Sequence, residues 1–212
     1  MVITEVIASG SGKESISVIF EDGSKIKTGA AEIVDFGLYP GRELTSDEYT
    51  TLISDLELRS SKARAIRMLG NRSLSAREIE KRLKSKGGSE EVATRTVEWL
   101  ENVGLVNDEE YALTIVKHYS LKGYGRARIR DELFKRGIQR ELWDAALAVL
   151  NDEDMSEKAY DFLGKKLGGS RDPQEVRRTV EALCRRGFSY EEARTAVKRY
   201  IESSDEAEDI EL

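Results

Sequence analysis

A five-residue pattern returns along the chain at intervals of 50 residues. The sequence LKSKG at residues 83–87 recurs as LFKRG at 133–137 and as LCRRG at 183–187. The leucine, the basic residue before the glycine and the glycine itself keep their places, and a glutamate follows four residues after each glycine. Self-similarity at a fixed period of this length indicates a repeat protein. The sequence therefore predicts tandem copies of one supersecondary unit.

Each copy is interpreted as three helices. The glycine of each pattern suits the position just after a helix, where left-handed backbone would strain a Cβ atom, and basic residues in the last turn suit the helix dipole. Stacked three-helix, helix-turn-helix-like repeats bury their apolar faces on one another, which predicts a mainly α fold in an elongated, curved array. We expect the second helices to start near Ser75, Gly125 and Gln174-Glu175, and the repeats to span 60–106, 107–150 and 151–202.

Residues 1–44 have a different pattern, typical of a small β-rich module. β-Branched runs at 2–7, 15–20 and 25–28 predict strands, with a Gly/Ser turn at 9–12. Asp22-Gly23 between two of these runs predicts a hairpin with a type I′ turn. A short helix is expected at 30–36, where the sheet would need a packing partner.

Two capping boxes mark where helices begin. Thr45 and Glu48 predict the start of a connecting helix over 45–59, which continues to Leu69 with a joint near Ser60-Ser61. Ser75 and Glu78 repeat the same spacing at the start of the next helix. At the other end, residues 203–212 carry five acids and no base, which predicts a frayed acidic tail.

Charge is distributed unevenly over the 212 residues. The whole chain has 34 basic and 40 acidic side chains and a net charge of −6, which taken alone argues against a nucleic-acid partner. Counted by segment, the balance is −6 over 1–61, +7 over 62–140 and −7 over 141–212. A basic middle between acidic ends favours a mixed surface that meets both polyanions and basic protein.

Several classes of protein can be excluded or disfavoured. The longest apolar runs fall far short of the roughly 20 residues of a membrane span, and the N-terminus lacks a basic leader. One cysteine, Cys184, allows no internal disulfide, so a reduced, cytoplasmic protein is expected. His118 is the only histidine, and we expect packing or surface roles for it and a buried filler role for Cys184. Trp99 and Trp143 are expected in the core, and no cluster indicates a catalytic site, a metal or a cofactor.

Two basic sets are the candidate binding residues. Arg126 and Arg130 share a helix face, whereas Arg128 points elsewhere. The alternative for both sets is a solvated helix face held by ion pairs one turn apart. The first set is Tyr124, Arg126, Arg128, Arg130, Lys135 and Arg136, and the second is Arg72, Arg77, Lys81 and Lys84.

The order and spacing of four motifs resemble the RecX family of bacterial recombinase regulators, over residues 60–202. These motifs are Ala65-x-x-Met68-Leu69, Arg72-Ser73-x-Ser75-x-x-Glu78-Ile79, Asp108-Glu109-Glu110-Tyr111-Ala112 and Gly123-x-Gly125-x-x-x-Ile129-x-x-x-Leu133-x-x-x-Gly137-Ile138. The β-rich module resembles an extension of longer family members.

The resemblance implies a non-enzymatic regulator. Its partner would be the RecA recombinase filament on single-stranded DNA, whose growth, ATP hydrolysis and strand exchange it would restrain in recombination, DNA repair and the SOS response. A possible direct DNA contact, no membrane and a monomeric state are expected with it. The alternative function is a helix-turn-helix DNA-binding protein, a transcription or DNA-architectural factor, which the acidic ends and the lack of a dimer element disfavour.

Overall fold

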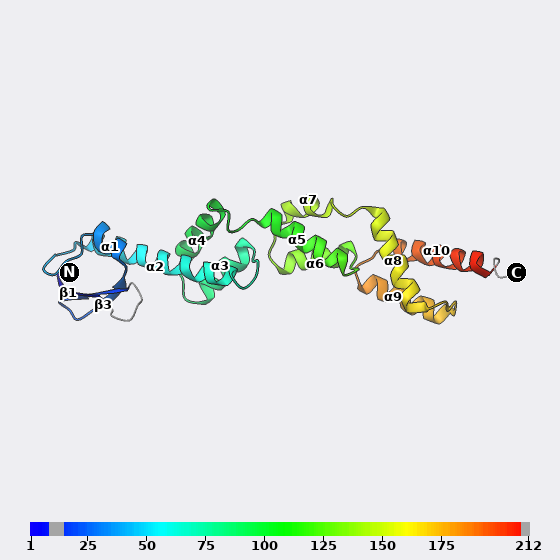
Figure 1. Cartoon of the computed structure of the whole chain (residues 1–212), viewed down its shortest axis with the longest axis horizontal. Coiled ribbons are helices and arrows are strands. Elements are labelled where there is room, and N and C mark those ends of the chain that lie inside the picture. The colour runs from blue at the N-terminus through cyan, green and yellow to red at the C-terminus, as the bar shows by residue number, and fades with distance from the viewer. Residues whose placement is uncertain (9–14, 209–212) are drawn as a thin grey trace. The chain divides into compact units, whose positions relative to one another are not determined.

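The computed structural model describes residues 1–8 and 15–208, with side chains through Ser203, and is mainly helical (Figure 1). It confirms the predicted fold class: helices follow one another along the chain after a single small sheet. Contacts divide the chain into two compact units, one formed by Met1–Asn71 and Glu80–Leu100 and the other by Arg72–Ile79 and the chain from Glu101 onward. No helix in the described part has the length and hydrophobicity that crossing a bilayer requires.

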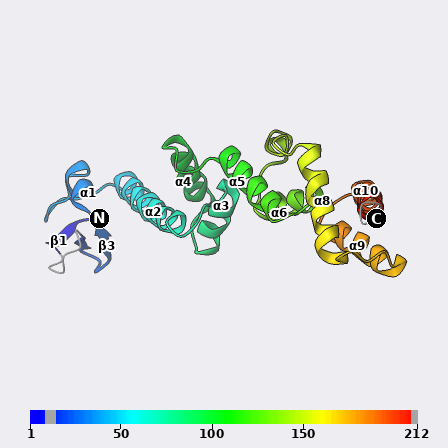
Figure 2. The same ribbon diagram turned by 45° about the vertical axis from the view of Figure 1, so that its right-hand side comes forward.

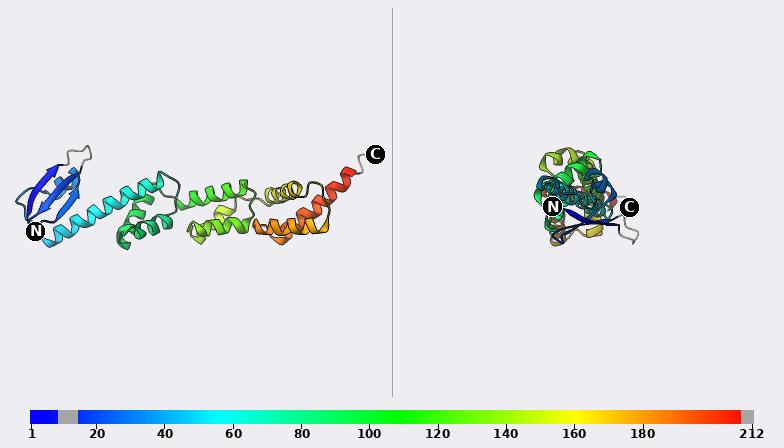
Figure 3. Two further views of the ribbon diagram at one scale, coloured as in Figure 1. Left: turned by 90° about the horizontal axis from the view of Figure 1, so that it is seen from below. Right: turned by 90° about the vertical axis from the view of Figure 1, so that its left-hand side faces the viewer.

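The N-terminal sheet is antiparallel, with strand order β1-β2-β3 (Figure 3). Ile3 pairs with Phe20 in the register of the sheet. Because successive side chains alternate between the two faces, both of these side chains lie on the inner face and are buried. A register shift between Ile3 and Glu5 bends the first strand. The strands are β1 (Ile3–Ala8), β2 (Ile16–Phe20) and β3 (Lys25–Thr28).

The hairpin at Asp22-Gly23 forms, but the predicted type I′ turn is wrong. The amide of Gly23 donates to the carbonyl of Phe20 (2.9 Å), and the amide of Phe20 donates to the carbonyl of Ser24 (3.0 Å), so the loop has three residues rather than two. Only Gly23 has a positive φ, 80°, and Asp22 does not. A three-residue loop that ends on a left-handed glycine needs positive φ at one position, whereas type I′ needs it at two.

The sheet is closed by α1 (Ala30–Asp35), the short helix expected there, and by the first turns of α2 (Ser46–Leu69). Leu52 of α2 is fully buried in the same cluster as Val18, Leu38 and Leu44. A marginal three-stranded sheet thus gains a core of its own by packing against helices. The prediction that the sheet leans on the following segment is confirmed.

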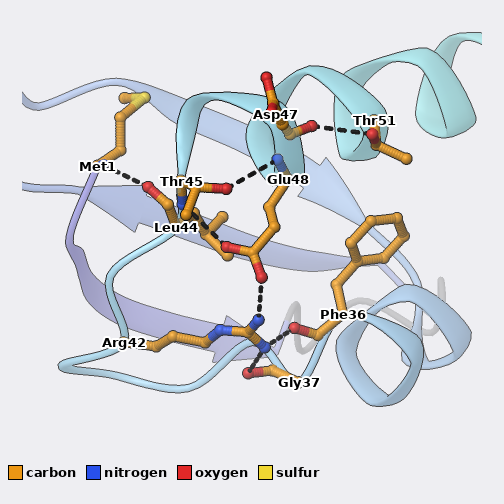
Figure 4. Close-up of polar contacts among 9 residues, drawn as sticks. All are labelled: Met1, Phe36, Gly37, Arg42, Leu44, Thr45, Asp47, Glu48 and Thr51. Carbon is orange, nitrogen blue, oxygen red and sulfur yellow. Dashed lines mark hydrogen bonds and ion pairs between the residues drawn. The ribbon is translucent and has the colours of Figure 1, made fainter.

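Polar contacts fix the start of α2 against this module (Figure 4). The Thr45–Glu48 capping box is present, with the Glu48 amide donating to Thr45 Oγ1 (3.2 Å) and the Thr45 amide donating to Glu48 Oε2 (2.9 Å). Arg42 donates to the carbonyl oxygens of Phe36 and Gly37 and forms a 2.9 Å ion pair with Glu48. The hydrogen bond from the Thr45 backbone, countered by partial burial, holds the pKa of Glu48 below its usual value.

One uninterrupted helix replaces the two expected segments around Ser60-Ser61. α2 runs through this pair to Leu69, so the joint expected there is absent. Its C-terminal half packs on α4 (Glu90–Asn102), where Thr96 Oγ1 donates to the buried Ser61 hydroxyl at 2.9 Å. Lys62 lies 4.6 Å from the ring centre of Trp99, which is half-buried at the edge of the helices rather than in the core.

The second and third repeats share one hydrophobic core. Ile129 and Leu133 from the second repeat belong to the same buried cluster as Met155, Leu163 and Leu183 from the third. Trp143 packs partly buried at its margin, and its Nε1 donates to the Ile138 carbonyl (3.0 Å). The helices of this unit (Figure 2) are α5 (Asp108–Leu121), α6 (Arg126–Lys135), the 3-10 turn Arg140–Leu142 with α7 (Trp143–Leu147), α8 (Asp152–Leu167), α9 (Pro173–Arg185) and α10 (Tyr190–Glu208).

The three repeated glycines end helices in the same way. Gly87, Gly137 and Gly187 have φ values of 87°, 71° and 92°. In each case the amide of the residue after the glycine donates to the carbonyl of the repeated leucine, at 3.1–3.2 Å. This bond pattern is the Schellman motif, which confirms the expected left-handed helix ends. The helices that end there are α3 (Ala76–Ser85), α6 and α9.

The C-terminal segment differs from the frayed tail expected from residue 203. Helix α10 continues through Glu208, because consecutive helix-forming residues follow Ser204 and no glycine or proline stops them. Residues 209–212 and the expected Gly/Ser turn at 9–12 lie outside the described residues.

Candidate functional site

The candidate basic residues lie mainly on α3, on α6 and at the ends of these helices. The boundary between the compact units crosses α3, so Arg72 and Arg77 belong to the second unit and Lys81 and Lys84 to the first. The other six residues, Tyr124 to Arg136, are all in the second unit. The contacts of each residue decide whether its charge is available to a partner.

Glu132 neutralises two residues of the α6 set. Its buried carboxylate accepts a hydrogen bond from the Tyr119 hydroxyl (2.9 Å) and forms ion pairs with Lys135 (3.2 Å) and Arg128 (3.3 Å). Burial alone would raise the pKa of Glu132, but the Tyr119 hydroxyl and the two cations outweigh it and hold that pKa below its usual value. Arg128 and Lys135 are therefore already paired with a buried carboxylate of their own helix.

Arg126 lies in the joint between the second and third repeats. Its guanidinium donates to the Leu150 carbonyl (2.7 Å) and pairs with Asp152 (2.8 Å), while Glu192 lies 3.7 Å away. The side chain is only 27% exposed. Arg126 thus connects α6 to the beginnings of α8 and α10, and its role in the structure is to hold two repeats together.

The backbone of the same joint is closed by two hydrogen bonds. The Gly125 amide donates to the Arg186 carbonyl (2.9 Å), and the Ala127 amide donates to the Gly187 carbonyl (3.1 Å). The free amides at the start of α6 are in this way satisfied by the glycine turn of the next repeat. A Cβ atom on Gly125 would lie 2.2 Å from the backbone of Gly187, so only glycine fits there.

Arg186 is a joint residue that the sequence argument missed. Its guanidinium lies 5.3 Å from the ring centre of Tyr124 and 4.7 Å from that of Phe162, and it donates to the carbonyl oxygens of Lys122 (3.3 Å) and Gly123 (3.4 Å). Tyr124 is therefore half-buried beneath an arginine of the third repeat. The available signal was the repeat itself, since Arg186 stands 50 residues after Arg136.

Arg136 occupies the corresponding joint at the start of α3. Its carbonyl accepts a hydrogen bond from the Ser75 hydroxyl, which also caps α3 by accepting from the Glu78 amide (3.0 Å). The guanidinium donates to the Tyr111 hydroxyl (2.7 Å) and lies against that ring. Ser75 and Gly125, 50 residues apart, thus both donate a hydrogen bond to the arginine carbonyl that precedes the next repeated glycine. Ser75 donates with its hydroxyl and Gly125 with its backbone amide.

Of the candidate residues in the second unit, Arg77 and Arg130 are exposed and make no ion pair with the residues that the structure describes. The aliphatic part of the Arg77 side chain packs over Gly137, where a Cβ atom would lie about 3 Å from it. This contact restricts the position of the Arg77 side chain. Arg130 stands one turn after Arg126 and lines the same groove of about 500 Å³ between α6 and the third repeat. The predicted common face of Arg126 and Arg130 is present. Arg72 is paired with Glu78 at 2.9 Å.

The first unit contributes Lys81 and Lys84. Lys84 bridges Glu80 (2.8 Å) and Glu90 (2.7 Å), and hydrogen bonds to these two carboxylates raise its pKa. Lys81 is exposed, and in the described part of this unit it makes no ion pair. The alternative of a paired helix face therefore fits Lys84, whereas Lys81 remains available.

The structure places both residues considered for chemistry at the surface. His118 is exposed on α5 with its ring against Tyr119. Cys184 is exposed on α9, so the expectation that it is a buried filler is wrong; the apolar side of α9 that faces the core is occupied by Leu183 instead. Over the described ranges, no three His, Cys, Asp or Glu side chains come together as a metal site.

Comparison with known proteins gives this arrangement a family. Residues 62–100 match the first three-helix domain of RecX, and residues 107–147 match the second. The chain is 31% identical over 199 residues to a protein named Regulatory protein RecX from Caldanaerobacter subterraneus subsp. tengcongensis, covering 93% of this chain and 98% of the relative. The chain belongs to the RecX family.

Further relatives and solved structures of RecX proteins agree. Regulatory protein RecX from Xanthomonas campestris pv. campestris (strain B100) is 31% identical over 141 residues, 66% of this chain and 86% of the relative. A crystal structure of regulatory protein RecX superposes with a TM-score of 0.73 at 20% identity, covering 93% of this chain and 98% of that one. The crystal structure of RecX from Lactobacillus salivarius superposes with a TM-score of 0.63 at 22% identity, covering 68% of this chain and 96% of that one. RecX membership makes this chain a regulatory protein, and the two structures show that the fold is shared.

Proposed function

We propose that this chain binds the RecA filament on single-stranded DNA and inhibits its ATP hydrolysis and strand exchange. The observation that carries the proposal is the match to Regulatory protein RecX over 93% of the chain. The basic middle segment supports it, because Arg77 and Arg130 on the second unit and Lys81 on the first are exposed cations without ion pairs in the described part. Such groups are free to contact phosphate or acidic protein surface.

A binding measurement separates this proposal from direct DNA binding. Labelled protein is titrated with single-stranded DNA alone, with duplex DNA alone, and with RecA filaments assembled on the same single strand, and fluorescence anisotropy is read at two salt concentrations. We expect binding to the filament to be at least tenfold tighter than to either DNA. Equal or tighter binding to bare duplex would instead support the helix-turn-helix DNA-binding alternative.

Charge reversal tests which residues make the contact. Arg130→Glu removes an exposed cation without ion pairs, so we expect filament affinity to fall several-fold while the circular dichroism spectrum stays helical. Arg178→Glu, which changes another exposed arginine on α9, is the charge-matched control and should leave affinity near that of the wild type. Arg126→Glu is a poor probe, because it breaks the joint to Leu150 and Asp152. If both exposed variants behave alike, the contact lies elsewhere.

A further inference from the structure

The third repeat has an apolar groove with a basic margin between α9 and α10. Its volume is about 980 Å³. Cys184 lines the groove and is exposed, Tyr190 is 69% exposed and Ile201 is 39% exposed. The other apolar lining residues are Pro173, Val176 and Val180, of which the two valines are half-buried and also pack against the hydrophobic core of this unit. Exposed apolar side chains that line a groove together are a feature of surfaces that bind another segment.

The 50-residue period identifies what such a helix face does elsewhere in the chain. Val176 and Val180 correspond to Arg126 and Arg130 of the second repeat. In the second repeat this face of α6 forms a groove with residues 187–195, the glycine turn and acidic first turns of α10. This helix face therefore receives the start of a following helix. No further repeat covers it on α9 within residues 1–8 and 15–208.

The charges around the groove indicate the chemistry of the occupant. Arg171, Arg177 and Arg185 line it, against one acidic side chain, Glu181. The Arg177–Glu181 pair is 3.6 Å long and exposed on both sides, so it holds the guanidinium weakly. In the second repeat the seated segment is likewise acidic, since Glu192 approaches Arg126 at 3.7 Å. Three arginines around valines suit a ligand with carboxylates beside an apolar stripe.

We propose that the α9–α10 groove binds an acidic amphipathic helix of a partner protein. The apolar stripe of that helix covers Val176, Val180 and Tyr190, and its carboxylates meet Arg177 and Arg185. This is the helix-in-groove mode of recognition, in which anchors three and four residues apart enter an apolar channel. The inference is independent of the RecA proposal, because it concerns a surface of the third repeat and a ligand defined by chemistry alone.

The single cysteine of the chain provides a direct readout. The probe is a synthetic 16-residue helical peptide with leucines along one stripe and glutamates elsewhere, and the matched peptide carries lysines in place of the glutamates. Alkylation of Cys184 by neutral iodoacetamide is followed on the full chain, whose only thiol lies in the groove. We expect the acidic peptide to slow alkylation at least fivefold and the lysine peptide to leave it unchanged. Equal protection by both peptides, or by neither, would overturn the proposal.

Two variants assign the two kinds of contact. Val180→Asp places a charge on the apolar lining and should lower the affinity for the labelled acidic peptide, measured by fluorescence anisotropy, at least tenfold. Because Val180 also packs against the core, this variant counts only if its circular dichroism spectrum and urea unfolding match those of the wild type. Arg185→Glu changes an exposed residue on the margin of the groove and should weaken binding at least threefold. Val149→Asp, at an exposed valine outside the groove, is the control and should bind as the wild type does. If Arg185→Glu binds the acidic peptide as tightly as the wild type does, the proposed contact between the arginines and the carboxylates of the peptide is wrong.

Two other occupants are distinguishable in the same experiments. A chain shortened after Ser204 lacks the acidic C-terminal residues, and a tenfold gain in peptide affinity on this truncation would mean that the chain's own end fills the groove. Sedimentation that shows a dimer abolished by Arg185→Glu would mean that a second copy fills it. Either result overturns the partner-protein proposal, whereas an unchanged affinity and a monomer that binds the acidic peptide support it.

Discussion

At the scale of single residues, the joints between repeats decide which side chains are free. Arg126, Arg136 and Arg186 lie at these joints, and each contacts a carbonyl, a hydroxyl or an aromatic ring of another segment. Arg130, one turn from Arg126, has no such partner in the described residues and is exposed. Adjacent arginines of one helix thus have different roles, because only one reaches the neighbouring repeat.

Gly125 gives the sharpest stability prediction. Gly125→Ala places a Cβ 2.2 Å from the Gly187 carbonyl, and the backbone on both sides is held by hydrogen bonds, so we expect a loss of about 1–3 kcal/mol in the free energy of unfolding. Urea unfolding measures it. Gly164→Ala in α8 is the matched control, because no atom lies within 4 Å of its added methyl group. That control should gain about 0.5–1 kcal/mol. Equal effects at both positions would contradict the close approach.

Glu132 is expected to make the free energy of unfolding depend on pH. Its pKa in the folded chain lies below the unfolded value, so its stabilisation is present above the unfolded pKa and is lost as pH falls through the folded pKa. Glu132→Gln removes the ion pairs to Arg128 and Lys135 and should cost about 1–3 kcal/mol at pH 7. Urea unfolding from pH 7 to pH 3 should show the gap between the two proteins narrowing below about pH 4. A gap of constant size would show that the carboxylate's charge does not matter.

At the scale of elements, one joint is built twice from different residues. The start of α3 meets the turn at Gly137 through the Ser75 hydroxyl, whereas the start of α6 meets the turn at Gly187 through the Gly125 and Ala127 amides. α9 begins instead with Pro173 capped by Asp172, whose carboxylate accepts from the Glu175 amide (3.0 Å). The first turn of α9 therefore has one amide satisfied by its own cap, and no glycine turn of a following repeat meets it within the described residues.

The Ser75 joint can be tested by removing one hydroxyl. Ser75→Ala loses both the α3 cap and the hydrogen bond to the Arg136 carbonyl at a fully buried position, so we expect a loss of about 2 kcal/mol. The Ser89 hydroxyl only caps α4, by accepting from the Val92 amide. Ser89→Ala should therefore lower the free energy of unfolding by about 1 kcal/mol. Thermal or urea unfolding compares them. A Ser75 variant no less stable than the Ser89 variant would mean that the joint bond contributes nothing.

Local signals predicted most of the elements, and long-range contacts account for what was missed. Glycine periodicity and the capping boxes are properties of a few neighbouring residues, so helix starts and the three Schellman ends were predictable. The partners of the Arg126 and Arg186 side chains lie 24 to 66 residues away in the sequence, and no local pattern encodes them. The prediction of a type I′ turn at Asp22-Gly23 was wrong because Phe20 pairs with Ser24, which leaves a three-residue loop.

At the scale of the whole chain, the net charge of −6 conceals a basic middle segment between acidic ends. The structure reduces the cations available for binding, since ion pairs with Glu80, Glu90 and Glu132 engage several of them. RecX membership makes the chain a regulator, and the remaining exposed cations are the groups we propose for contact with the filament. Binding that depends on few cations should weaken only moderately as salt rises, in contrast to a protein that contacts many phosphates.

The most direct test is the rate of ATP hydrolysis by RecA on single-stranded DNA as this protein is added. Our account predicts that the rate falls well below that of RecA alone when the protein is present at a small fraction of the RecA concentration. Arg130→Glu should require several times more protein for the same fall, and Arg178→Glu should not. A rate that stays unchanged up to equimolar protein would contradict the proposal that this chain inhibits the RecA filament.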